Sequence, residues 1–356
     1  MRARSLTSDL DLRRLGAAAA AGTLLGGAGV AVAYRRSPVL QREVLEAKRF
    51  LGPLPPLSVA PPVPPPTPPG RALLVTGRGE VFVRDSGPPA GDADAPTVLL
   101  LHGWTASADL NFFPVYEPLA ENYRVVAVDH RGHGRGLRSV ERFTLEDCAD
   151  DAAGVLRELG IRQAIVLGYS MGGPISLLLA HRHPDLVAAL VPQATALEWR
   201  ATLYERLVWR GLALWELGRR VGTFDVFVER LVREAVKLAP EVGPYGPWLV
   251  AEFRRGFAPW LAEAGKALSE FDARPFAPQL GKPAVVCVTT KDRLVRPRKQ
   301  YQLAEALSAE VIEVAGDHGV PVMRGGRYTT ATLTAIQKVA ARAGLRRGDM
   351  ATPVAG

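Results

Sequence analysis

The feature that most constrains the fold is an alternation of short apolar runs with helical patterns, which begins near residue 70. Several runs are continuous in Val, Leu, Ile and Ala, as in strands buried on both faces of a mostly parallel sheet. The predicted strands are Ala72–Thr76, Val81–Arg84, Thr97–Leu101, Arg124–Val128, Ala164–Leu167, Val187–Val191, Ala284–Thr289 and Val311–Val314. The predicted helices are Thr144–Leu159, Met171–Arg182, Arg298–Leu307 and Arg327–Arg342. This order indicates an α/β fold.

The alternation is interrupted once, between residues 195 and 280, where the pattern is helical. An insertion at this point is predicted to form a cap over the strand ends. It carries five of the six tryptophans, namely Trp199, Trp209, Trp215, Trp248 and Trp260. These side chains are expected to form the core of the cap and in part to line an apolar pocket. The predicted core then comprises 71–194 and 281–342, followed by a flexible tail over 343–356.

A basic segment, 1–14, precedes twenty uncharged residues, 15–34, which end at a second arginine pair. Twenty helical residues at about 1.5 Å each match the roughly 30 Å hydrocarbon thickness of a bilayer. We therefore expect a single-pass membrane anchor. A cleaved signal, which would give a secreted protein, is the alternative, because small residues occur near the end of the run. Arginines on both sides leave the orientation open.

Residues 35–70 are predicted to be a linker. Ten prolines fall within 53–69, and proline both fixes φ and lacks an amide donor. A semi-rigid polyproline II spacer between membrane and domain is the expected structure, although PxxP spacing could also attract an SH3-like partner.

The formal net charge of +8 does not indicate nucleic-acid binding. Residues 1–50 hold nine basic and four acidic side chains, so most of the excess lies outside the predicted domain. The two cysteines, Cys148 and Cys287, lack a CxxC spacing and are expected to be small buried side chains. A disulfide-dense secreted scaffold is excluded.

The strongest chemical motif is Gly168-Tyr169-Ser170-Met171-Gly172, which lies between a predicted strand and a predicted helix. A tight turn in this context exposes the serine hydroxyl above the sheet, and Gly168 and Gly172 relieve crowding around it. The helix N-terminus directs amides toward developing negative charge. Ser170 is therefore predicted to be a nucleophile.

A serine nucleophile needs a base. His181 and His183 lie at the far end of the helix that Ser170 begins, roughly 16 Å of helix rise away. His318 follows the last predicted strand, in the position expected for the base after such a turn. We predict that His318 Nε2 takes and returns the proton.

The acid should follow the strand before that one. Asp292 stands just past Ala284–Thr289, and we predict that it orients His318 and stabilises its cation. Glu198 is the alternative acid, while Asp317, adjacent in sequence to the histidine, is expected to point elsewhere.

The tetrahedral intermediate also needs hydrogen-bond donors. The backbone amides of Met171 and Trp104 are the predicted oxyanion hole. His102 and Gly103 begin the loop that carries Trp104, and His102 is expected to hold this loop rather than act as a base. Tyr169 and Trp199 are the candidates for the substrate pocket.

Asp129, His130 and His133, in a glycine-rich turn, form an incomplete ligand set for a metal. A structural turn is the expected role, and no metal site is predicted.

Together the HGW, DHRGHG, GYSMGG, KDRLV and GDHG segments resemble the α/β-hydrolase superfamily, in its lipase, esterase and perhydrolase-like branch. The resemblance covers roughly 71–342. It implies an eight-stranded sheet with a helical cap, no cofactor, and a triad of Ser170, Asp292 and His318. One departure is Asp317, where a small glycine is common before the histidine.

Members of this superfamily that open epoxides or dehalogenate use an aspartate nucleophile, so Ser170 argues against both reactions. The reactions that remain compatible with a serine nucleophile are ester or thioester hydrolysis, carbon–carbon bond hydrolysis and perhydrolysis. The aromatic cap and predicted anchor favour a small-molecule apolar ester as substrate. A non-catalytic binding protein on the same scaffold is a second class of function, and an adaptor role for stalk and anchor is a third.

Overall fold

The computed structural model describes residues 63–90, 92–200, 205, 209, 232–233, 236–237, 240–255, 258–323 and 325–345. The predicted segments 1–14 and 15–34, most of the linker and nearly all of the tail lie outside these residues. Within the described part of the chain, no helix is both long and apolar enough to cross a membrane. The membrane anchor therefore stays a prediction.

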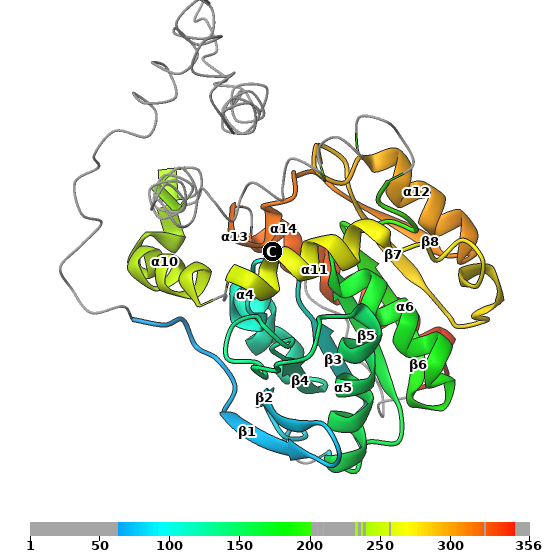
Figure 1. Ribbon diagram of the computed structural model, residues 1–356, viewed down its shortest axis with the longest axis horizontal. Helices are drawn as coiled ribbons and strands as arrows, with labels where there is room; N and C mark the ends of the chain where they lie inside the picture. Colours follow the sequence, from blue (N-terminus) through cyan, green and yellow to red (C-terminus); the bar gives the residue numbers. More distant parts are fainter. Residues whose placement is uncertain are drawn as a thin grey trace, which may run out of the picture.

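The core is one eight-stranded sheet in the order β1-β2-β4-β3-β5-β6-β7-β8 (Figure 1). Its strands are β1 Gly70–Val75, β2 Gly79–Asp85, β3 Thr97–Leu101, β4 Arg124–Val128, β5 Ala164–Tyr169, β6 Val187–Gln193, β7 Val285–Thr289 and β8 Glu310–Val314. The pairs β1–β2 and β2–β4 are antiparallel, and every other neighbouring pair is parallel. The predicted mostly parallel eight-stranded sheet is confirmed.

Helices cover both faces of the sheet (Figure 1). One layer contains α5 Leu145–Glu158, α6 Gly172–Arg182 and α12 Pro297–Ala306, whose apolar side chains share a buried cluster. The opposite layer contains α4 Ala108–Ala120 and α14 Gly325–Arg342. Strands between these layers are buried on both sides, which explains their continuous apolar runs.

The sequence pattern does not predict α4. Pro114 and Pro118 lie inside this helix, where proline removes a backbone donor and normally interrupts a helix. Burial of Phe112, Val115 and Tyr116 against the sheet offsets that cost, and Ser107 caps the first turn by accepting from the Leu110 amide. The tertiary contacts override the local signal.

The described part of 195–280 contains α10 Gly246–Arg254 and α11 Ala258–Glu270. α11 crosses above the strand ends, and α10 lies beyond α4 (Figure 1). The chain enters and leaves this region at a short backbone pairing, because Glu198 bridges Asp272 and the Ala273 amide donates to the Leu197 carbonyl. We call this pairing the neck.

The remaining described elements are short. Three 3-10 turns lie at Pro184–Leu186, Pro240–Tyr245 and Ala277–Gln279, and α13 Val320–Met323 follows the loop after β8. Since β3, β5, β7 and β8 run in the same direction, the loops that follow them meet at one edge of the sheet. The site forms at this edge.

Candidate active site

Ser170 stands on a strained turn between β5 and α6. Its φ is +52°, in the left-handed region that residues with a side chain rarely adopt. A Cβ at Gly168 would lie 2.2 Å from the carbonyl oxygen of Gly172, and one at Gly172 would lie 1.9 Å from that of Leu101. Only glycine fits at both places, so the motif glycines are required by the tightness of the turn.

Ser170, His318 and Asp292 form a chain of two hydrogen bonds, although they lie far apart in sequence. The distance from Ser170 Oγ to His318 Nε2 is 2.9 Å. The distance from His318 Nδ1 to Asp292 Oδ2 is 2.7 Å. With Asp292 ionised, Nδ1–H donates to the carboxylate and Nε2 accepts from the serine hydroxyl. The structure thus brings together the three side chains proposed from the motif order.

Asp292 is almost completely buried, yet it is held as an anion. Burial alone would raise the pKa of this carboxyl group, but His318 and hydrogen bonds from Val295 and Thr289 lower it below its usual value. Oδ1 accepts from the amides of Leu294 and Val295, at 2.8 and 2.9 Å. A fixed anion in this position suits an imidazole that must gain a proton.

Gln300, on α12, supports the same carboxylate and has no counterpart in the sequence predictions. Its side chain is fully buried. Its amide group donates to Thr289 Oγ1 at 2.8 Å, and Thr289 Oγ1 donates to Asp292 Oδ2 at the same distance. A glutamine in an amphipathic helix carries no signal of this kind, since the contact depends on how α12 packs on β7.

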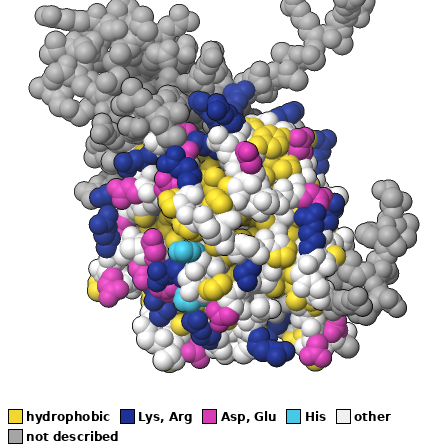
Figure 2. Space-filling view, turned by 90° about the vertical axis from the view of Figure 1, so that its right-hand side faces the viewer, with side chains coloured by type: hydrophobic (Ala, Val, Ile, Leu, Met, Phe, Trp, Pro, Cys, Tyr) yellow, Lys and Arg dark blue, Asp and Glu magenta, His cyan; other side chains and the backbone are white. Residues whose placement is uncertain are grey.

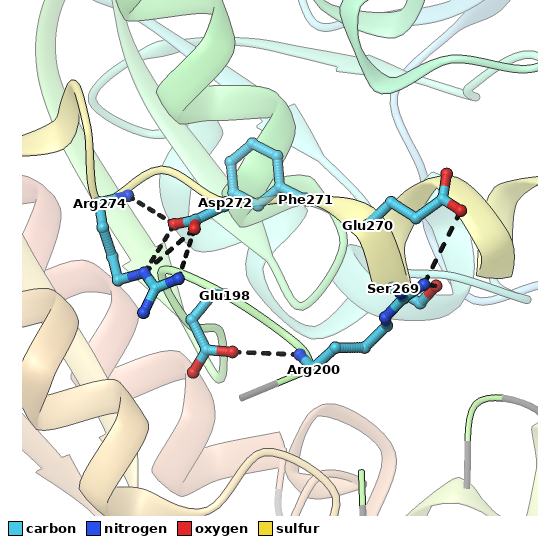
Figure 3. A pocket seen from close by; sticks show the side chains of 7 residues that line it. All are labelled: Glu198, Arg200, Ser269, Glu270, Phe271, Asp272 and Arg274. Carbon is cyan, nitrogen blue, oxygen red and sulfur yellow. Dashed lines mark hydrogen bonds and ion pairs between the residues drawn. The ribbon is translucent and has the colours of Figure 1, made fainter. Parts of the chain in front are cut away.

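The alternative acid, Glu198, lies at the neck. Its carboxylate is 2.9 Å from Lys299 Nζ. It also borders a surface hollow of about 300 Å³ (Figure 3), lined by Glu198, Arg200, Ser269, Glu270, Phe271, Asp272 and Arg274. Arg274 binds Asp272 at 2.5 Å. None of the seven residues belongs to the triad, and their mixed charge does not suit an apolar ester.

The loop after β3 passes directly beside the nucleophile. A Cβ at Gly103 would lie 3.2 Å from the Ser170 Cβ, so the absence of a side chain there permits the approach. The Gly103 amide donates to Asn111 Oδ1 at 2.7 Å and is thereby occupied. Trp104 follows, and Met171 is the residue between Ser170 and α6. The two amides proposed as the oxyanion hole therefore belong to segments that meet at Ser170.

His102 ties this loop to the next one. Its Nε2 accepts from the His130 amide at 2.9 Å, which places the proton on Nδ1, and Nδ1 donates to the Gly103 carbonyl at 2.7 Å. Burial lowers the pKa of His102 to about 4, so the ring is neutral at pH 7. This geometry is that of a support, in line with the expectation that His102 is not the base.

The glycine-rich turn with His130 and His133 is also structural in its contacts. Asp129 Oδ1 and Oδ2 accept from the amides of Ala108 and Arg135, both at 2.7 Å. Gly132 and Gly134 have positive φ values. No group of three or more His, Cys, Asp or Glu side chains is arranged to hold a metal ion in the parts of the chain that the structure describes.

The two pocket candidates lie in different surroundings. Tyr169 is buried under the site, and its hydroxyl donates to the His318 carbonyl at 2.8 Å. It therefore holds the histidine backbone instead of facing substrate. Trp199 belongs to a row of indoles: its ring centre is 6.1 Å from that of Trp209, which is 5.9 Å from that of Trp104.

The charged side chains of the described surface are mixed in sign. Figure 2 shows Lys and Arg side chains interspersed with Asp and Glu side chains over one side of the described residues. This distribution agrees with the near-neutral charge that the sequence gives to the domain.

The chain is similar to known proteins in sequence and in fold. A family model described as the alpha/beta hydrolase fold matches residues 96–234. A pimeloyl-[acyl-carrier protein] methyl ester esterase of Neisseria meningitidis is 32% identical over 206 residues, covering 56% of this chain and 77% of that enzyme. A bifunctional esterase/perhydrolase of Acinetobacter calcoaceticus is 36% identical over 111 residues, 30% of this chain, and the chain spans only 37% of its length.

The crystal structure of an enol-lactonase from Burkholderia xenovorans superposes with a TM-score of 0.64 at 22% identity, over 75% of this chain and all of that one. At this identity the likeness concerns the fold alone. The family match and the esterase that is covered over most of its length together show that the chain belongs to the α/β-hydrolase family.

Proposed function

We propose that this chain is a serine hydrolase that cleaves a carboxylic ester of an apolar acid through an acyl-enzyme on Ser170. The observation that carries the proposal is the hydrogen-bonded chain from Ser170 Oγ through His318 to Asp292. A buried serine on a strained turn, with a base on one side and an ionised acid behind that base, is the arrangement that nucleophilic acyl transfer requires.

In the proposed reaction, Ser170 Oγ attacks the ester carbonyl carbon while its proton passes to His318 Nε2. The carbonyl oxygen becomes an oxyanion, which the amides of Trp104 and Met171 bind. His318 then gives the proton to the leaving alcohol as the ester bond breaks. Water then attacks the acyl carbon while His318 takes its proton, and His318 returns that proton to Ser170 Oγ as the bond from the acyl carbon to Ser170 breaks and the acid leaves. Asp292 stabilises the imidazolium in both steps.

An apolar substrate is supported by the cap. Trp104, in the loop beside Ser170, forms a row of rings with Trp209 and Trp199 of the cap region. Phe113 of α4 packs edge-on against Trp248 of α10, with ring centres 5.6 Å apart, and Val322 of α13 packs against the same cluster. Aromatic surfaces of this kind favour acyl chains or rings over charged groups.

The test is a panel of p-nitrophenyl esters of increasing acyl length, with fluorophosphonate labelling of the same protein. Turnover should be measurable, and Ser170→Ala should abolish labelling and lower kcat by on the order of 10⁴–10⁶-fold. Ser176→Ala is the matched control, since that buried serine of α6 donates to the Gly173 carbonyl within its own helix. The absence of both turnover and labelling in the wild-type chain would refute the proposal.

Perhydrolysis is a second candidate, favoured by the esterase/perhydrolase relative. Peracid formation from a short carboxylic acid and hydrogen peroxide, dependent on Ser170, would identify it. Carbon–carbon bond hydrolysis on the same triad is tested with a diketone. A non-catalytic binding protein would keep its full function in Ser170→Ala.

We further propose that residues 15–34 anchor the chain in a membrane, with secretion after signal cleavage as the alternative. Support comes from the uncharged twenty-residue stretch and the proline-rich spacer that follows it. Membrane fractionation of the full chain against a chain lacking 1–69 tests this. Recovery of the full-length, uncleaved chain in the soluble fraction would contradict it.

A further inference from the structure

The loop that begins with His102 and ends at Ser107 is attached to both described helices of the cap. This loop, residues 102–107, carries Trp104, whose amide is one of the two proposed oxyanion donors. It starts directly after β3 and ends at Ser107, the residue that caps the N-terminus of the α4 helix. The contacts at Trp104 and at Ser107 come from α11 and α10, respectively.

The first contact joins Trp104 to α11. The indole Nε1–H donates to the Leu261 carbonyl at 2.7 Å. A Cβ at Gly265 would lie 2.8 Å from the Trp104 ring, so the helix presents a glycine where the indole lies against it. The ring is thus fixed both by a directed hydrogen bond and by close packing on the helix surface.

The second contact joins Ser107 to α10. Ser107 Oγ donates to Glu252 Oε2 at 2.6 Å and accepts from the Leu110 amide at 3.2 Å, so it spans the cap and the start of α4. Both Ser107 and Glu252 are at most 1% exposed. A buried carboxylate requires partners, and Glu252 Oε1 has Arg255 at 2.6 Å and Arg135 at 3.4 Å.

Arg135 extends this contact into the core. Its guanidinium group binds Asp109 at 2.7 Å and Asp129 at 3.1 Å, and the same Asp129 accepts from the first amide of α4. Glu252 therefore completes a buried charge cluster that surrounds the start of α4. Without it, the Ser107 hydroxyl would lose its acceptor in a site closed to water.

We infer that Glu252 is a positioning residue of the cap, which holds the 102–107 loop and with it the oxyanion donor at Trp104. The inference rests on the proposed function in one respect, the use of the Trp104 amide. Because hydrogen bonds to an oxyanion are sensitive to small displacements, loss of this contact should affect the transition state more than substrate binding.

The variants are Glu252→Leu, which removes the acceptor of the Ser107 hydroxyl, Ser107→Ala and their double mutant. The control is Glu158→Leu, which removes a carboxylate at the end of α5 that accepts from the amide and the hydroxyl of Thr76, outside the cap and the 102–107 loop. We expect Glu252→Leu and Ser107→Ala each to lower kcat and the fluorophosphonate labelling rate by about tenfold or more, with KM changed less than threefold. The double mutant should be no worse than the poorer single one, because one hydrogen bond links the pair.

Hydrogen exchange gives a readout that needs no activity. The amides of 102–107 should exchange faster in Glu252→Leu, while those of α5 and α6 keep their wild-type rates. Equal kcat in Glu252→Leu and wild type, or unchanged exchange in the loop, overturns the inference. If Glu252→Leu does not fold, Ser107→Ala is judged by the same two measurements. An inactive wild-type chain refutes the proposed function instead, and the exchange rates still test the contact.

Discussion

The site has two halves, and different parts of the molecule support them. The acid–base half contains His318 and Asp292, and the oxyanion half contains the 102–107 loop. Asp292 receives its hydrogen bonds from β7, from the turn after it and indirectly from α12, and the His318 carbonyl is held by Tyr169 of β5. The 102–107 loop is held by His130 and Asn111 of the core, and in addition by Leu261 and Glu252 of the cap helices. In the proposed mechanism, proton transfer therefore depends on the sheet, whereas stabilisation of the oxyanion depends also on the cap.

This difference has a mechanistic meaning. The acid–base half must keep one geometry for any substrate, and a sheet that is buried on both faces is the most rigid support available. The oxyanion half contacts the carbonyl oxygen, which lies next to the acyl group that varies between substrates. A cap that binds the acyl group is therefore in a position to align the donor loop at the same time.

The largest effect should come from breaking the acid–base half alone. Asp292→Asn keeps the shape of the side chain but removes the anion that orients His318. We expect kcat to fall by about 10³–10⁴-fold, with little change in KM for a short ester. Steady-state kinetics measures this loss, and hydrogen exchange in 102–107 should stay at the wild-type rate. A loss of less than tenfold would place the acid elsewhere.

A smaller effect is expected from the histidine that supports the oxyanion half. Burial lowers the pKa of His102 to about 4 and that of His133 to about 3, below the ordinary value of 6.5. At a pH between the ordinary value and these lowered values, the two histidines bind protons in the unfolded chain but not in the folded chain. The free energy of unfolding should therefore fall as the pH decreases from about 6.5 toward 4, by up to about 3 kcal/mol for His102.

The His102→Gln variant isolates the contribution of His102 to the pH dependence of the free energy of unfolding. A glutamine can accept from the His130 amide and donate to the Gly103 carbonyl without titrating. Urea unfolding at pH 7, 6 and 5 should show a shallower pH dependence than in wild type, by up to one proton. An identical slope in the two proteins would show that His102 is not a source of the acid sensitivity.

The smallest effect should come from Tyr169→Phe, which removes the hydroxyl that holds the His318 carbonyl. A net hydrogen bond of about 1 kcal/mol corresponds to a fall in kcat of roughly fivefold. The matched control is Tyr301→Phe, which removes a bond to Glu313 on the surface of α12 and should leave kcat unchanged. Faster exchange in 102–107 with Tyr169→Phe would mean that the two halves are not separately supported.

The parts of the site that follow strand order can be predicted from the sequence. Ser170, Asp292 and His318 each stand just after an apolar run, and parallel strands bring such positions to one edge. The eight strands are equally accessible to prediction, because their apolar runs are short and bounded by turn residues. The α4 helix, which contains Pro114 and Pro118, could not be predicted in this way, because its stability comes from packing on the sheet.

The contacts that carry no local pattern could not be predicted. Ser107 and Glu252 are 145 residues apart, and neither is distinguished from other serines or glutamates in the sequence. Tyr169 shows the same limit of sequence-based prediction, because here the sequence suggests a contact that the structure does not have. Its place beside the nucleophile suggests a substrate contact, but the alternation of side chains along β5 turns its ring into the core, toward Tyr328 and His318.

The neck has a consequence for how the cap can vary. Because the Ala273 amide donates to the Leu197 carbonyl at 2.8 Å, the two ends of the insertion lie next to each other. A segment whose ends already meet can be lengthened, shortened or exchanged without moving the strands on either side. We therefore expect that a cap grafted from another family member would change the substrate preference without disturbing the sheet, provided that the graft brings its own acceptors for Trp104 and Ser107.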